Sequence, residues 1–203
     1  SSLTSQLGKE NKKFLYGAIK QGARAKDYEL AIQWLVDAGI VHKVSRVREV
    51  LAPLKFYEDL SAFKLFLLDC GLFACMVEAP AKQMLIGDNV FREFKGAFTE
   101  QFVLQQLVAM SITPYYWSNS TSPAEIDFVI QTANRVVPIE VKAEENVRAR
   151  SMKVYIDGHP EAHLKGLRLS MKGYVDQGWM ENLPLYGLFV IGGMYYVVLQ
   201  PLV

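Results

Sequence analysis

The sequence has few cysteines and no excess of charge of either sign. Its two cysteines, Cys70 and Cys75, lie in one apolar segment without a second cluster, so buried reduced thiols are expected rather than a zinc site or a disulfide. The formal net charge is +1, which excludes an overall basic field of the kind that attracts nucleic acid. A local basic face remains open.

A signal segment and a clear membrane helix are also lacking. The chain begins at Ser1 rather than at a methionine, and no apolar signal segment follows. Residues 183–203 carry no charged residue, but Pro184, Pro201 and the pair Gly192-Gly193 favour a β-hairpin over a spanning helix. We therefore expect a cytoplasmic protein without a membrane partner, cut from a longer chain.

What is present is a chain of 203 residues, 51% of them hydrophobic, which suits one large or two small α/β (α+β) domains. Residues 1–80 predict two helices, Lys9–Lys20 and Tyr28–Ala38, with Asp27 before the second as its N-cap. Two strands follow, Ile40–Val47 and Phe63–Leu68, with a loop between them. This order predicts a winged-helix-like domain; another small α+β domain is the alternative.

Basic side chains gather at two places in the sequence. Lys12 and Lys13 lie in the N-terminal domain, and Arg148, Arg150 and Lys153 lie in a later predicted helix. These five residues are the candidate contacts to nucleic acid. Acidic neighbours dilute the N-terminal patch, so packing against another protein is the alternative there.

A connection, 81–95, leads to a second domain at 96–203. The pattern predicts a helix, three strands, a helix and a further strand around a central mixed sheet. Their expected ranges are Phe98–Met110, Tyr115–Trp117, Ile126–Gln131, Val136–Val141, Arg148–Asp157 and Leu167–Met171.

The two middle strands place three charged residues together. If the turn is centred between Ala133 and Asn134, Asp127 pairs across the hairpin with Glu140. Side chains alternate between faces, so Lys142 shares the face of Glu140. Two carboxylates directly opposite one another are unfavourable. A divalent cation is the simplest group that would offset their repulsion.

A third carboxylate, Glu100, lies on the apolar stripe of the helix upstream. One interpretation is that Glu100 lies in the first turn, solvated and favourable to the helix dipole. The other is that the helix packs on the sheet and directs Glu100 at Asp127 and Glu140.

Glu100, Asp127 and Glu140-Val141-Lys142 resemble the ordered motif of the PD-(D/E)XK nuclease superfamily, with its restriction-endonuclease-like fold. The resemblance implies that all four charged residues are catalytic. Asp127 and Glu140 would hold Mg²⁺, with Glu100 as an auxiliary ligand. Lys142 would orient the attacking water or stabilise developing negative charge.

Longer segments resemble the uncharacterised C-terminal region of prokaryotic AAA-type ATPases. They include AFKLFLLDCGLFACM, FKGAFTEQFVLQQL, YYWSNSTSPAEIDFVI and VVPIEVKAEENVRARSMKVY. The resemblance implies a winged-helix-like part followed by a nuclease-like domain. The sequence has no G-x-x-x-x-G-K-[ST], so ATP would bind only in an ATPase domain preceding Ser1.

We therefore expect Mg²⁺-dependent hydrolysis of DNA, or engagement of DNA at a nuclease-like site, under the control of that ATPase domain. The alternatives are a catalytically silent module that binds DNA or a protein, and a purely structural assembly domain. Aromatic residues at Tyr115–Trp117 could stack on bases, although strand aromatics more often belong to a core or an edge. Pro160 argues against a helical metal pair formed by His159 and His163.

Overall fold

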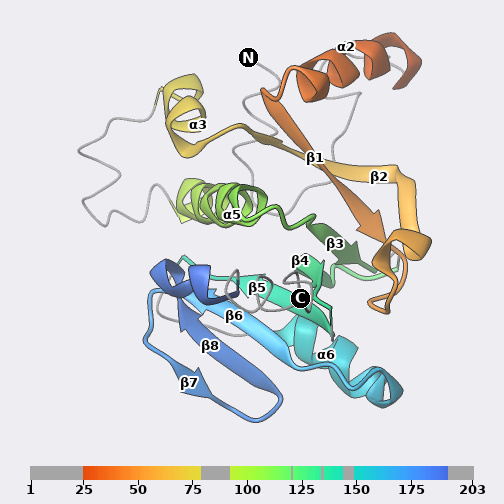
Figure 1. Ribbon diagram of the computed structural model, residues 1–203, viewed down its shortest axis with the longest axis vertical. Helices are drawn as coiled ribbons and strands as arrows, with labels where there is room; N and C mark the ends of the chain where they lie inside the picture. The colour runs from red at the N-terminus through yellow and green to blue at the C-terminus, as the bar shows by residue number, and fades with distance from the viewer. Residues whose placement is uncertain (1–24, 79–91, 120, 134, 144–148, 192–203) are drawn as a thin grey trace, which may run out of the picture. The chain divides into compact units, whose positions relative to one another are not determined.

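The computed structural model describes residues 25–78, 92–119, 121–133, 135–143 and 149–191 (Figure 1). The chain forms two compact units that interleave along the sequence. Unit 1 comprises Ser1–Val44 and Ser61–Gln105, and unit 2 comprises Ser45–Leu60 and Gln106–Val203.

Unit 1 contains α2 (Ala25–Asp37), α3 (Cys70–Met76) and most of α5 (Arg92–Ala109). It also contains the beginning of β1 (Val41–Val47) and the end of β2 (Glu58–Leu67). Gly39 follows α2 with a φ of +69°, a conformation that glycine adopts without strain, so it ends the helix as expected. The core of this unit gathers buried apolar side chains, namely Ile32, Val41, Phe63, Leu65, Leu67, Phe73 and Ala97.

The elements of unit 1 match the sequence prediction in part. The second helix and both strands are present, but α2 begins two residues before Asp27, which therefore is not its N-cap. Helix α3 was not expected; Asp69 caps it by accepting a hydrogen bond from the backbone N–H of Leu72 at 2.7 Å. The helix predicted at Lys9–Lys20 lies outside the described residues. The described part is a mixed α/β arrangement without a specific winged-helix assignment.

The prediction that both cysteines are buried is wrong. Both cysteines are free thiols, as expected, but Cys70 is half-buried and Cys75 is exposed. Burial and the neighbouring Asp69 charge raise the pKa of Cys70 to about 11. The first thiol is therefore unreactive near neutral pH.

The strands pair in the order β2-β1-β3-β4-β5-β6-β8-β7. The strands that follow β2 in the sequence are β3 (Tyr115–Ser118), β4 (Glu125–Gln131), β5 (Val136–Val141), β6 (Gly166–Ser170), β7 (Val175–Asp176) and β8 (Met180–Pro184). Neighbours β1–β3, β5–β6 and β6–β8 are parallel, whereas β3–β4, β4–β5 and β7–β8 are antiparallel. The expected mixed sheet is confirmed.

Helix α6 (Arg150–Gly158) connects the parallel strands β5 and β6, as a parallel crossover requires. Its buried side chains, Met152 and Tyr155, belong to the core of unit 2. At Gly166, the first residue of β6, an added Cβ would lie 2.7 Å from Met152 Cε. The absence of a side chain at Gly166 therefore lets the helix approach the sheet closely.

The predicted C-terminal hairpin is wrong in its described half. Leu185–Gly187 forms a 3-10 helix (η5) and residues 189–191 are helical. Leu188 and Ile191 are buried while Phe189 is 69% exposed, so the apolar spacing is three residues, as in a helix, rather than two. The other half, 192–203, lies outside the described residues.

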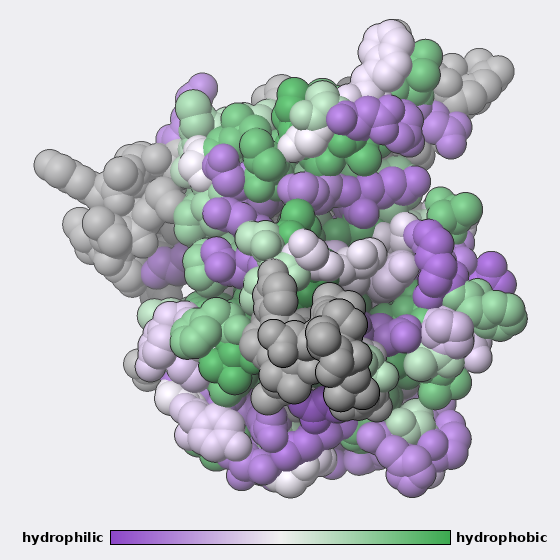
Figure 2. Space-filling view, in the orientation of Figure 1, coloured by the Kyte–Doolittle hydropathy of each residue, from purple (hydrophilic) through white to green (hydrophobic). Residues whose placement is uncertain are grey.

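In the described part of the chain, no helix is long and apolar enough to cross a membrane. On the face shown in Figure 2, small groups of hydrophobic and hydrophilic residues alternate. Such mixing is ordinary, because more than half of a folded protein's accessible surface is apolar.

Replacing Met152 with alanine should lower the free energy of unfolding by about 2–5 kcal/mol, because the fully buried side chain leaves a cavity beneath α6. Val154→Ala, on the same helix at a position that is 69% exposed, should change it by less than about 0.5 kcal/mol. Urea unfolding measures both. Equal losses in the two variants would contradict the packing of α6 described above.

Candidate functional site

The hairpin formed by β4 and β5 has the predicted register. Phe128 pairs with Ile139 and Gln131 pairs with Val136, so the next pair toward the open end is Asp127 and Glu140. The polar turn is closed by hydrogen bonds between Thr132 and Arg135, the shortest of them 2.8 Å long. The two carboxylates therefore face each other across adjacent strands.

Both carboxylates are buried, with Asp127 2% and Glu140 6% exposed. Asp127 Oδ2 accepts a hydrogen bond from the backbone N–H of Val141 at 2.7 Å. Glu140 Oε1 lies 2.7 Å from Lys142 Nζ, so these two residues share a face as predicted. The other oxygen, Glu140 Oε2, is buried and has no hydrogen-bond partner in the described part of the chain. Such an atom is unfavourable unless another group satisfies it.

The electrostatics of the pair follow from this burial. Desolvation raises the pKa of Glu140 to about 8, and the nearby charge of Asp127 acts in the same direction. The Lys142 ammonium opposes the shift but does not cancel it. Near neutral pH, and with only these groups present, the Glu140 carboxyl therefore retains its proton in a large fraction of molecules.

The polar row continues beyond the hairpin onto two further strands. Glu140 pairs with Arg168 on β6, and Arg168 pairs with Asn182 on β8. Arg168 Nε donates to Asn182 Oδ1 at 2.8 Å, and Ser170 Oγ donates to the same oxygen at 2.8 Å. Asp127, Glu140, Arg168 and Asn182 thus form one buried polar row across four neighbouring strands.

Both the oxygen and the nitrogen of the Asn182 side-chain amide form hydrogen bonds. Its Nδ2 donates to the backbone carbonyls of Lys172, at 3.1 Å, and Gly173, at 2.7 Å. This fixes the side chain that accepts from Arg168. Burial lowers the pKa of Arg168 while Glu140 raises it, but a guanidinium stays charged at every pH of interest.

The sheet face changes character between successive rows. Gly166, two residues before Arg168, pairs with Met180, and Met180 belongs to the core that includes Met152 of α6. The row under α6 is therefore apolar, and the next row along the strands carries the charges. Arg168 and Asn182 were not predicted, although an arginine between two leucines in LRL is a signal that the side chain needs a polar partner.

Glu100 belongs to unit 1, on α5. It is 5% exposed, and its Oε2 lies 3.8 Å from Nζ of Lys64, which is also buried. Because α5 begins at Arg92, Glu100 lies in the middle of the helix, and the prediction of a solvated first-turn position is wrong. Its role as an auxiliary ligand beside Asp127 and Glu140 stays a prediction. Among the described residues, no three His, Cys, Asp or Glu side chains form a group able to hold a metal ion.

The candidate nucleic-acid contacts are described only in part. Arg150 is exposed at the first residue of α6. Lys153 Nζ bonds to Asp157 Oδ1 at 3.1 Å and lies 4.9 Å from the centre of the Trp179 ring. Lys12, Lys13 and Arg148 lie outside the described residues.

Two family models match parts of the chain. Residues 95–192 match Domain of unknown function (DUF4143). Residues 1–83 match Domain of unknown function (DUF8612). DUF4143 domains are known to occur on the C-terminal side of AAA ATPase domains. The DUF4143 match contains the whole polar row as well as Glu100, but neither description states an activity. No curated protein and no solved structure matches the chain.

Replacing Glu140 with glutamine should stabilise the metal-free protein in a pH-dependent way. Glu140 binds its proton in the folded state up to about pH 8 but releases it near pH 4.5 when unfolded. The folded state therefore binds more protons between these values, and the free energy of unfolding falls as the pH rises through this window. Glu140→Gln removes this decline, which amounts to about 1.4 kcal/mol per unit of pKa difference.

The measurement is urea unfolding at several pH values with a chelator present. The free energy of unfolding of the variant, relative to that of the parent chain, should increase from pH 5 to pH 8. Glu161→Gln, at an exposed position on the same unit, makes the same chemical change outside the row and serves as the control. If Glu140→Gln changes the free energy of unfolding by the same amount at pH 5 and at pH 8, the raised pKa of Glu140 is contradicted.

Proposed function

We propose that the chain is a nuclease-like module in which Asp127 and Glu140 hold a divalent cation, Mg²⁺ first among candidates, for hydrolysis of DNA phosphodiester bonds. The observation that carries the proposal is the buried Glu140 Oε2, which lacks a hydrogen-bond partner among the described residues. A cation bound between the facing carboxylates would satisfy this oxygen and remove their repulsion.

The residues fit the chemistry of Mg²⁺. Hard divalent cations prefer carboxylate oxygens, and the row supplies two buried carboxylates on adjacent rigid strands. When bound, the ion would neutralise charge on the scissile phosphate and lower the pKa of a coordinated water. Glu100 is proposed as an auxiliary ligand on the strength of the resemblance to the PD-(D/E)XK superfamily alone.

The neighbouring cations suit the other tasks of the reaction. Lys142, anchored to Glu140 Oε1 at 2.7 Å, would orient the attacking water or stabilise developing negative charge. Arg168, held by Asn182 in the next strand, would lie beside the phosphate bound to the cation at Glu140. A buried guanidinium beside a buried carboxylate is otherwise expected only as a structural ion-pair partner.

We further propose that an AAA-type ATPase domain precedes this module in the parent protein and controls it. The support is the position of DUF4143 domains relative to AAA ATPases, together with the resemblance of the wider sequence. ATP would bind in that domain, since this sequence contains no P-loop motif.

A silent interaction module, binding DNA or a protein, is the second candidate. The observation in its favour is that Lys142 and Arg168 already lie against Glu140 and compensate part of the carboxylate charge. In such a module the polar row would act only to fix the register of the strands.

Replacing Asp127 with asparagine should weaken Mn²⁺ binding at least about tenfold and abolish any cleavage of single- or double-stranded DNA, because one of two charged ligands is lost. Asparagine retains an oxygen that can accept from Val141. Asp157→Asn, at an exposed position of α6, removes the same charge away from the row and is the matched control.

Calorimetric titration with Mn²⁺ and a gel assay of DNA cleavage provide the two readouts. If Asp127→Asn binds Mn²⁺ and acts on DNA as the parent chain does, the proposed site is wrong. Metal binding that depends on Asp127 without cleavage of any DNA would instead favour the silent module.

A further inference from the structure

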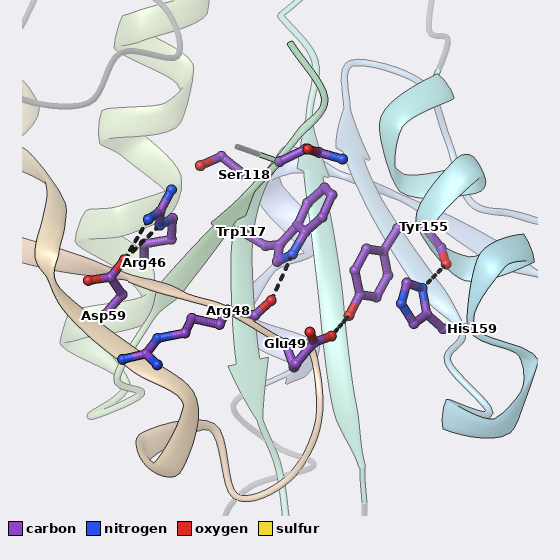
Figure 3. Close-up of a pocket in the computed structure, with 9 residues that line it drawn as sticks. Arg46, Arg48, Glu49, Asp59, Trp117, Ser118, Tyr155 and His159 are labelled. Carbon is purple, nitrogen blue, oxygen red and sulfur yellow. Dashed lines mark hydrogen bonds and ion pairs between the residues drawn. The ribbon is translucent and has the colours of Figure 1, made fainter. Parts of the chain in front are cut away.

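A cavity in unit 2 lies apart from the carboxylate pair and has a different chemistry. Its volume is about 460 Å³, within the roughly 300–1,000 Å³ of small-molecule sites. Arg, carboxylate, aromatic and small polar side chains line it, from the end of β1, the loop after it, β2, β3 and α6 (Figure 3). We propose that this cavity binds one nucleotide unit, with the base against Trp117 and the phosphate at Arg48.

The indole of Trp117 forms a fixed flat wall of the cavity. Its Nε1 donates to the backbone carbonyl of Arg48 at 3.3 Å, and its ring lies 4.6 Å from that of Tyr155 in an edge-on arrangement. The ring is half-buried and its only hydrogen-bond donor is already used. The remaining surface that Trp117 offers to a ligand is an aromatic face, which suits stacking on a base.

Tyr155 is locked in turn, so the aromatic wall is preorganised. Its hydroxyl donates to Glu49 Oε2 at 3.1 Å and accepts from the backbone N–H of Val50 at 2.9 Å. The ring of His159 stacks on it with a centroid distance of 4.1 Å and an angle of 16°. Figure 3 shows Trp117, Tyr155 and His159 side by side along the cavity.

His159 adds an acceptor of hydrogen bonds. Its Nδ1 lies 2.8 Å from the backbone carbonyl of Tyr155, and a carbonyl only accepts, so Nδ1 carries the proton. In the neutral ring Nε2 is then an acceptor, suited to the amino or imino N–H groups of a base.

Arg48 supplies the positive charge for a phosphate. Arg46, the other arginine of the cavity, is engaged by Asp59 through both Nε and Nη2. The guanidinium of Arg48 is exposed, and no described carboxylate forms an ion pair with it. Asn119 lies at the same rim, and its Oδ1 accepts from the backbone N–H and hydroxyl of Thr121 at 2.8 and 2.9 Å. Its amide donors are thereby oriented away from that turn.

A nucleotide unit matches this combination of groups better than an apolar or purely anionic ligand. A cavity with the aromatic wall alone would favour an uncharged ring as its ligand. An exposed arginine alone would bind anions without distinguishing among them. Stacking of the base and a charge-assisted hydrogen bond to the phosphate would both favour binding. The unit could belong to a free nucleotide or to a single strand of nucleic acid.

The test uses the fluorescence of Trp117. The chain contains three tryptophans, so Trp34→Phe with Trp179→Phe leaves Trp117 as the sole indole. Thymidine 5′-monophosphate should quench it saturably, whereas thymidine and inorganic phosphate should bind at least about tenfold more weakly, since each lacks one of the two contacts. If the double variant unfolds, the indole N–H resonance of Trp117 in the parent chain gives the same readout by NMR.

Arg48→Gln should weaken binding of the monophosphate at least about tenfold, to the level of thymidine. Arg135→Gln, an exposed arginine of the same unit outside this cavity, is the matched control and should leave binding unchanged. A short oligothymidylate distinguishes the sources: tighter binding than the monophosphate identifies a strand, and equal or weaker binding identifies a free nucleotide.

The proposal is overturned if the monophosphate does not perturb Trp117, if thymidine binds equally well, or if Arg48→Gln is without effect. This outcome is independent of the nuclease proposal. Asp127→Asn should retain full nucleotide binding, because Asp127 does not line the cavity.

Discussion

The opposition of Asp127 and Glu140 is the constraint on which the arrangement of unit 2 depends. The hairpin register places the two carboxylates on facing positions of β4 and β5, and the sheet buries both. The two carboxylates cannot be separated unless β4 and β5 shift in register, and that register also aligns the apolar side chains of the hairpin. The repulsion must therefore be relieved by protonation, by neighbouring cations or by a bound metal ion.

The rest of the sheet is arranged around that constraint. Lys142 approaches from the same strand, and Arg168 approaches from β6, where Asn182 holds its guanidinium. Under α6 the preceding row is apolar and closely packed at Gly166. The buried charges of this face are thus confined to one row, while the adjacent row provides the packing that keeps the strands in place.

The hairpin and its charged pair could be predicted from sequence because both depend on local information. A polar turn between β-branched segments sets the register, and alternation then places Asp127 opposite Glu140 and Lys142 beside it. Arg168 and Asn182 could not be placed in the same way, since the register of parallel strands is set by the docking of α6 and the later connections. The prediction also missed the start of α5 at Arg92 and the helical spacing of Leu188 and Ile191.

The most direct measurement of the central claim is the titration of the Glu140 side-chain carboxyl by carbon-detected NMR, with and without Mg²⁺. Without the ion, the carboxyl should titrate near pH 8, because burial and Asp127 hold its pKa high. With saturating Mg²⁺, its pKa should fall below the ordinary value of a glutamate, since a bound cation favours the carboxylate. An unchanged pKa in the presence of Mg²⁺ would contradict the assignment of Asp127 and Glu140 as a cation site.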